Sequence, residues 1–163
     1  MKIIGIDPGL SGAIAILQEK KVLNIFDMPV MSEGKKNKKQ LNSAHLVKLL
    51  RDNLVENEET SVVVEQVNAM PGQGVTSMFN FGQTFGAIKG VCAALGLPIF
   101  FVRPSKWKKH FELINSSKDS SRTKAIEMYP SLSNDLAKKK DVNKSDAILI
   151  ARFFSETRLN DGN

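Results

Sequence analysis

Three short apolar runs, separated by turn-forming residues, occupy the first 28 positions of the chain. The runs cover residues 2–7, 13–17 and 22–28, and the segment Pro8-Gly-Leu-Ser-Gly12 between the first two is typical of a tight turn. Short strands joined by tight turns pair with their neighbours as an antiparallel meander. The chain is therefore expected to begin with three antiparallel strands.

After this meander the sequence alternates helical and strand patterns. Residues 29–40 are polar and lysine-rich, which predicts a mobile loop, and apolar residues then recur at helical spacing over 46–54, with Asn42 or Ser43 as the N-cap. Val62–Val64 form a continuous apolar run that ends in Glu65, as expected of a strand covered on both faces. The later pattern predicts a helix over 77–95, a strand over 98–102 and helices over 121–129 and 147–154. This order predicts an α/β fold in which a mixed sheet carries helices on both faces.

Composition narrows the class of protein. A chain of 163 residues with 42% hydrophobic residues can bury a core without disulfides or structural metals. Cys92 is the single cysteine and lies in an apolar helical stretch, so it is read as a core residue and not as a disulfide partner, zinc ligand or nucleophile. The apolar runs are too short to span a bilayer, and we expect the chain to open on a strand and not on a secretory leader. We expect one globular domain over residues 1–163, located in the cytoplasm.

The net charge of +6 is unevenly distributed. Most of the Lys and Arg residues lie in three segments, at 35–39, 103–124 and 138–144. Concentrated positive charge suits a polyanion, and nucleic acid is the commonest one. The alternative is a solvated surface that keeps the protein in solution, and charge alone leaves both open.

Three carboxylates stand where burial would be costly without compensation. Asp7 and Glu65 each close an apolar strand, and Asp146 opens the apolar helix. Ligands of α/β sheets bind at the carboxyl ends of strands, so neighbouring strands would place Asp7 beside Glu65. A divalent cation relieves the repulsion between clustered carboxylates, and oxygen ligands favour Mg²⁺ or Mn²⁺ over zinc.

Each acid also has a structural alternative. Asp7 precedes Pro8-Gly9 and could form an Asx turn, Glu65 could pair with a lysine, and Asp146 could cap its helix. Asp141 precedes Val142 as an N-cap would, so capping and metal binding are both open for it. Gly82, Gly86 and Gly90 form a stripe of small residues that would admit either a helix of a partner subunit or the sheet beneath.

The motifs together resemble those of the RuvC-like Holliday junction resolvases, within the ribonuclease H-like superfamily. The resemblance covers residues 1–154 and rests on Ile3-Ile-Gly-Ile-Asp7-Pro-Gly, on Val64-Glu65-Gln-Val and on Asp141-Val-Asn-Lys-Ser-Asp146-Ala. The segments Met70-Pro-Gly-Gln-Gly, Phe81-Gly-Gln and Pro104-Ser-Lys-Trp-Lys-Lys are similar to the branch found in bacteriophages and prophages.

This resemblance implies a five-stranded mixed sheet, made of the antiparallel meander plus parallel strands, and a homodimer. It implies a crossover junction endodeoxyribonuclease that makes paired cuts in four-way DNA junctions, with two Mg²⁺ or Mn²⁺ ions per site. Its acids fall on Asp7, Glu65 and Asp146. The position one helical turn before Asp146 holds Asn143 where the family has an acid or histidine. Asp141 is therefore chosen as the fourth metal ligand, with the carbonyl of Asn143 as the alternative.

The resemblance also assigns residues to the DNA. Lys108 and Lys118 match positions that approach the scissile phosphate, although both could be solvated surface lysines. The DNA-binding set that we expect is Lys106, Lys108, Lys109, Lys118 and Arg122. Trp107 is read as a packing anchor and not as a base-stacking platform. Asn68 stands where the bacterial cellular branch carries an aromatic wedge, and Met70 or Phe79 could substitute.

Two other functions remain open on sequence grounds. One is a ribonuclease H-like nuclease that processes RNA. The other is a branched-DNA-binding module without catalysis, which Asn143 makes conceivable. No membrane partner is expected.

Overall fold

The computed structural model describes residues 1–34, 38–68 and 71–158. Seven strands and five α-helices follow one another in this part of the chain, with short 3₁₀ turns at Pro130–Leu132 and Lys139–Asp141. The elements are β1 (Lys2–Asp7), β2 (Ala13–Gln18), β3 (Lys21–Asp27), β4 (Val30–Glu33), β5 (Lys38–Leu41), α1 (Ser43–Asp52), β6 (Thr60–Glu65), α2 (Val75–Ala94), β7 (Ile99–Val102), α3 (Pro104–His110), α4 (Ser120–Met128) and α5 (Val142–Arg158). None of the helices in these ranges is long and apolar enough to cross a bilayer.

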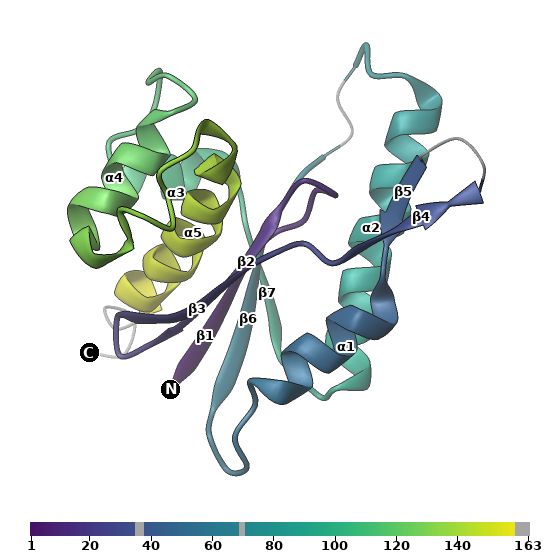
Figure 1. Cartoon of the computed structure of the whole chain (residues 1–163), viewed down its shortest axis with the longest axis horizontal. Helices are drawn as coiled ribbons and strands as arrows, with labels where there is room; N and C mark the ends of the chain where they lie inside the picture. Colours follow the sequence, from purple (N-terminus) through teal and green to yellow (C-terminus); the bar gives the residue numbers. More distant parts are fainter. Residues whose placement is uncertain (35–37, 69–70, 159–163) are drawn as a thin grey trace.

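The central sheet has five strands in the order β3-β2-β1-β6-β7. Strands β1, β2 and β3 pair antiparallel, whereas β6 pairs parallel with both β1 and β7. This arrangement confirms the predicted mixed sheet, in which a meander is extended by parallel strands. Helices α3, α4 and α5 lie on one side of the sheet, and α1 and α2 lie on the other (Figure 1).

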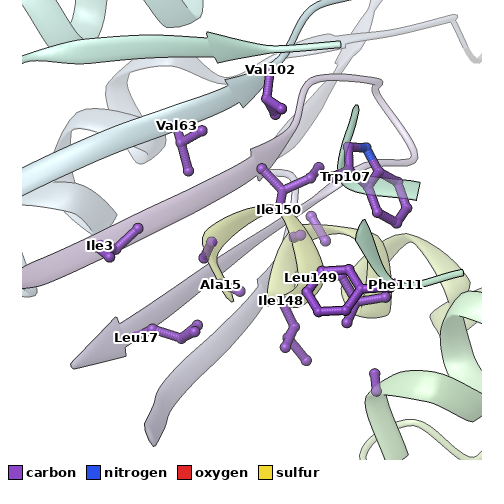
Figure 2. Packing of buried hydrophobic residues seen from close by; sticks show 14 of the residues in the cluster. Ile3, Ala15, Leu17, Val63, Val102, Trp107, Phe111, Ile148, Leu149 and Ile150 are labelled. Carbon is purple, nitrogen blue, oxygen red and sulfur yellow. The ribbon is translucent and has the colours of Figure 1, made fainter. Parts of the chain in front are cut away.

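Side-chain alternation along the strands divides the core into two layers. Ile3 and Val63 pack with Ile148 of α5, and Figure 2 shows this layer. Ile4 and Val62 are direct neighbours of Ile3 and Val63 in the sequence, so their side chains point to the opposite face and belong to the layer under α1 and α2. Residues spaced by two along a strand share a face, so Asp7 and Glu65 continue the rows of Ile3 and Val63. Both carboxylates are therefore directed to the α5 side of the sheet.

Gly5 allows α5 to lie directly on β1. A Cβ atom at Gly5 would come within 2.2 Å of the Ala147 backbone oxygen and 2.8 Å of the Ala151 Cβ. No side chain larger than hydrogen fits at these distances. The glycine in the first apolar run thus sets the height of α5 above the sheet.

Two parts of the fold differ from the sequence-based expectations. Residues 29–40 were expected to form a loop, but β4 and β5 pair as an antiparallel hairpin that ends in the buried Leu41. The strands are mostly polar and exposed, so they lack the apolar alternation by which a strand is predicted. Lys35 and Lys36 of the basic segment lie outside the described residues.

Helix α3 was not predicted. It begins with Pro104 at its first position, where the fixed φ of proline suits a helix and the missing N–H costs nothing. The helix is only seven residues long, and Trp107 is its buried residue, so no apolar period reveals it.

The glycine stripe of α2 faces open space. A Cβ atom at Gly82, Gly86 or Gly90 would meet nothing within 4 Å. The sheet beneath is therefore not the reason for these glycines, and that alternative is wrong. Val75 and Phe79 of the same helix are 86% and 64% exposed, which leaves α2 with an uncovered and mostly uncharged face.

Candidate active site

The site is built where two parallel strands end side by side. Ile6 of β1 is in register with Val64 of β6, so one residue further the register brings Asp7 next to Glu65. The turn after β1 is held tightly, since the Gly12 N–H donates to the Gly9 carbonyl at 2.8 Å and the Gly9 N–H points at Asp7 Oδ1 from 3.5 Å. The sequence placed Asp7 beside Glu65 only if their strands are neighbours, and the parallel pairing of β1 with β6 meets that condition.

Asp146 joins the two strand ends from the first turns of α5. Its neighbour Ala147 lies over Gly5, two residues before Asp7 on the same face of β1. The electrostatics of the acids agree with this placement. Burial first, and then the charges of Glu65 and Asp146, raise the pKa of Asp7 to about 7. Three acids from distant parts of the chain thus act on one another.

The other two acids are also held in a setting that disfavours charge. Burial raises the pKa of Glu65, although the Trp107 N–H bond to its carboxylate lowers it, and the charge of Asp146 raises it further. Burial likewise raises the pKa of Asp146, against the nearby Ser121 hydroxyl and Lys108. The neighbouring cations therefore do not fully compensate the negative charge that these three acids carry when all of them are ionised.

Unsatisfied atoms at this site indicate what would complete it. Asp146 Oδ1 and Ser121 Oγ are both buried and have no hydrogen-bond partner among the described residues, so the Ser121 hydroxyl influences Asp146 without forming a bond to it. A buried carboxylate oxygen without a partner, beside two further carboxylates, fits a hard divalent cation such as Mg²⁺ or Mn²⁺.

The three carboxylates lie too far apart in this structure to enclose a metal ion together. Among the described residues, no three His, Cys, Asp or Glu side chains are grouped tightly enough to enclose a metal ion. Like charges separate when no cation lies between them. A shared ion would therefore have to draw Asp7, Glu65 and Asp146 closer than they lie in this structure.

Asp141 does not join these three acids. Its Oδ2 accepts the Lys138 N–H at 2.8 Å, and its Oδ1 lies 3.3 Å from Lys144 Nζ. Burial alone would raise the pKa of Asp141, but these contacts outweigh burial and hold it below its ordinary value. The sequence left helix capping and metal binding open for Asp141, and its hydrogen bond with the Lys138 N–H is a capping contact.

Asn143 is tied to the turn after β1. Its Nδ2 donates to the Ser11 carbonyl at 2.6 Å, across 132 positions of sequence. The amide therefore links the start of α5 to the turn that follows Asp7. A carboxylate could not make this bond, because it has no proton to donate.

Lys108 is the cation most closely coupled to the site. Its charge lowers the pKa of Asp7, Glu65 and Asp146 alike, whereas the charge of Lys118 acts on Asp146. The Lys108 ammonium lies 5.4 Å from the centre of the Trp107 ring, within cation–π range. Of the two lysines predicted for the scissile phosphate, Lys108 is thus the more central.

The other residues predicted to contact DNA differ in their exposure and in the bonds that their side chains already make. Lys106 and Lys109 are exposed on α3. Arg122 instead makes a two-bond pair with Asp119, at 2.8 Å for each bond, and donates to the Leu136 carbonyl. Its guanidinium is therefore engaged in holding the segment around α4.

Of the two residues that could replace the aromatic wedge, Met70 and Phe79, the structure describes only Phe79. Asn68 is exposed just beyond Glu65, and Met70 lies outside the described residues. Phe79 is 64% exposed on α2 and is available to a partner.

Trp107 has a role that its sequence context did not reveal. It is fully buried, as expected of a packing anchor, but its indole Nε1 also donates to Glu65 Oε1 at 3.1 Å. The two residues are 42 positions apart, and no local pattern signals a bond across such a distance. The nearness of Ser121 to Asp146 was missed for the same reason.

No family model matches the sequence, and no curated protein matches it either. Solved structures do match. The RuvC of T. thermophilus in complex with a Holliday junction substrate is 18% identical and aligns over 98% of this chain and 96% of its own, with a TM-score of 0.62. The chain has the RuvC-like resolvase fold.

Two further structures with the RuvC-like fold agree. A second Thermus thermophilus RuvC structure is 18% identical, with 97% of each chain covered and a TM-score of 0.55. The fowlpox virus Holliday junction resolvase is 17% identical, with 97% of this chain and 99% of its own covered and a TM-score of 0.51. Identities this low concern the fold, and the fold agrees with the resemblance that the motifs suggested.

Proposed function

We propose that this chain is a metal-dependent, structure-selective endonuclease that resolves four-way DNA junctions by paired phosphodiester hydrolysis. Other branched DNA is a further candidate substrate. The observation that carries the proposal is the convergence of Asp7, Glu65 and Asp146 at one end of a RuvC-like sheet, with the pKa of each raised. Residues 1–163 would act as one nuclease domain in the cytoplasm.

The acids would hold the metal. Asp7, Glu65 and Asp146 offer carboxylate oxygens from three elements, and Asp146 Oδ1 has no hydrogen-bond partner in the part of the chain that the structure describes. Mg²⁺ or Mn²⁺ ions bound here would supply Lewis-acid activation of water and stabilise the leaving 3′-oxygen, in a site that would take two such ions.

The chain's own residues would orient and neutralise the substrate. Lys108 already acts electrostatically on all three acids, so a phosphate over them would lie within its field. A lysine ammonium offsets the negative charge that develops on a phosphoryl group in the transition state. Lys118, whose charge acts on Asp146, would assist from the side of α4. The carboxylates would need a cation to remain ionised together near neutral pH, which couples their charge state to metal binding.

DNA would be held mainly through its phosphates. The net charge of +6 and the exposed Lys106 and Lys109 beside the site support this. Contacts of this kind release counterions, so binding should weaken steeply as salt rises. Arg122 is a weaker candidate for the DNA because Asp119 already occupies it.

The uncovered face of α2 supports a homodimer. Large apolar side chains are normally buried, whereas α2 has Val75 and Phe79 exposed beside the open glycine stripe. Glycines at four-residue spacing would let the same helix of a second copy approach closely. A two-fold dimer would present two identical sites to a roughly two-fold junction, which accounts for paired cuts.

The experiment that tests the function is a nicking assay on a synthetic mobile four-way junction with Mg²⁺. Linear duplex and structured RNA serve as comparison substrates, and Asp7→Asn serves as the inactive control. Symmetric nicks in the junction alone support the proposal. Preferential cutting of RNA would indicate an RNA-processing nuclease, and junction binding without any metal-dependent nick would indicate a binding module.

A further inference from the structure

Trp107 is the only tryptophan of the chain, and its side chain is fully buried. It lies in the core layer between the sheet and α5, near Val102 and Ile150 (Figure 2). A buried indole N–H needs an acceptor, because an unpaired donor in the core costs free energy. The acceptor is Glu65 Oε1 at 3.1 Å, so the packing anchor and the candidate metal ligand are joined.

The bond leaves one half of the Glu65 carboxylate free. Among the described residues, the hydrogen bond that reaches this carboxylate comes from Trp107 and goes to Oε1. Glutamate has three side-chain torsions, and a fixed donor at one oxygen removes most of that freedom. Oε2 accepts no hydrogen bond from the described residues, so it would be the oxygen available to a cation. Groups that orient metal ligands in this way typically contribute 10- to 100-fold to metal affinity.

Helix α3 is held firmly enough for Trp107 to act as a fixed donor. At the end of the helix, His110 Nε2 lies 2.6 Å from Glu156 Oε2 of α5, and the His110 ring meets Phe153 edge-on at 5.2 Å. Phe111 is buried directly after the helix. The indole therefore has little room to follow Glu65 if that side chain moves.

We propose that Trp107 is a positioning residue for Glu65, and that its indole N–H sets the affinity of the carboxylate site for divalent metal. This inference rests on the metal dependence in the proposed function. The same short helix carries Lys108, whose charge acts on all three acids. One helix would thus fix both the orientation of a metal ligand and the cation nearest the phosphate.

The test is Trp107→Phe, which keeps a large aromatic ring and removes the N–H. Mn²⁺ affinity is measured without DNA, by electron paramagnetic resonance of the free ion, so that the readout does not depend on nuclease activity. We expect Mn²⁺ to bind roughly 10- to 100-fold more weakly than to wild type. Phe154→Leu is the matched control, because it alters an aromatic side chain of the same core layer that packs against Phe100 of β7, and its Mn²⁺ affinity should stay near that of wild type.

A double-mutant cycle separates positioning from general loosening. In a Glu65→Gln background, Trp107→Phe should change Mn²⁺ affinity by less than about twofold, because there is no carboxylate left to orient. An equal loss in both backgrounds would overturn the proposal, and so would a Trp107→Phe protein that binds Mn²⁺ as tightly as wild type. Absence of Mn²⁺ binding by wild type would overturn the metal-dependent function as well, so the two failures are distinguishable.

A second measurement covers the case in which Trp107→Phe does not fold. The single indole N–H gives one cross-peak in a ¹H–¹⁵N spectrum of the wild-type protein. Saturating Mg²⁺ should shift this peak in wild type and leave it in place in Glu65→Gln. A peak that does not move while Mg²⁺ binds would refute the coupling between the indole and the metal.

Discussion

The backbone oxygen of Ala147 in α5 lies directly over Gly5 of β1, so close that a Cβ atom at Gly5 would meet it at 2.2 Å. This contact fixes the first turns of α5 over the end of β1. Asp146 precedes Ala147 and Asp7 follows Gly5 by two residues, so the same contact brings the two acids to one corner. The geometry of the candidate site therefore depends on a residue that has no side chain.

Gly5→Ala should destabilise the protein by about 1–3 kcal/mol or more, because α5 must lift from the sheet to admit the methyl group. Urea denaturation measures this loss. Gly9→Ala is the matched control, since a Cβ atom there would meet its nearest neighbour at an ordinary 3.7 Å. Equal stability of the two variants would contradict the close approach of α5.

Asp7→Asn should abolish metal-dependent cutting of a four-way junction. Binding of the junction should stay intact or tighten, because one negative charge facing the phosphate is removed. A gel-shift titration and a nicking assay on the same labelled junction give both quantities. Cutting at the wild-type rate would show that Asp7 is not part of a metal site.

The raised pKa of Asp7 predicts a pH dependence of stability in the absence of metal. An acid whose pKa is higher in the folded protein binds its proton more tightly there than in the unfolded chain. Wild type should therefore gain stability as the pH falls from about 7 toward the ordinary value near 4, and should lose it again as the pH rises. Asp7→Asn should lack this gain and be the more stable protein above pH 7.

Urea denaturation with a chelator, at roughly pH 5 and pH 8, tests that expectation. The quantity to compare is the difference in unfolding free energy between wild type and Asp7→Asn, because carboxyls that are not coupled to Asp7 titrate equally in both. Those others include Glu156, whose pKa is lowered on balance because its bonds to His110 and Arg152 outweigh burial. A difference that does not change with pH would refute the prediction.

Lys108→Met should slow junction cutting by roughly 10²-fold at saturating DNA, as the loss of one electrostatic stabiliser of a transition state does. Lys106→Met, on the same helix but without influence on the acids, should instead weaken binding and reduce its salt dependence. Single-turnover rates and binding isotherms at several salt concentrations separate the two effects. Equal effects of both variants would place Lys108 among the ordinary phosphate contacts.

Gly86→Leu should convert the proposed dimer into a monomer, because the new side chain would occupy the space that a second α2 helix needs. Sedimentation velocity measures the change, and the junction assay should then show single nicks in place of paired ones. Ala44→Leu, an equally apolar change at an exposed position of α1, is the control. A Gly86→Leu protein that sediments as wild type would place the dimer interface elsewhere.

The predictable part of this fold is the part with apolar periodicity. Strands β1, β2 and β6 are nearly all buried, so their apolar runs predict them. The acid at the end of β1 and of β6 marks the candidate site. The hairpin of β4 and β5 is polar and pairs only with itself, so no pattern predicts it. Local sequence reports burial well and reports isolated hairpins poorly.

The acids of the candidate site could be picked out from the sequence, but the side chains that surround them could not. Asp7, Glu65 and Asp146 stand out because each ends or opens an apolar element, whereas the bond from Trp107 to Glu65 depends on tertiary packing. The choice between Asp141 and Asn143 could not be made from the sequence either. The structure commits Asp141 to Lys138 and Lys144, and Asn143 to the Ser11 carbonyl, through contacts that only the folded chain creates.

The central sheet divides the hydrophobic core into two halves, one on each face. The acids lie with α3, α4 and α5 on one side of the sheet, and the bare face of α2 lies on the other (Figure 1). Five strands insulate each half from the other, so a new binding face could evolve on α2 without disturbing the chemistry. Evolution could in this way remodel the α2 surface while leaving the acids of the candidate site in place.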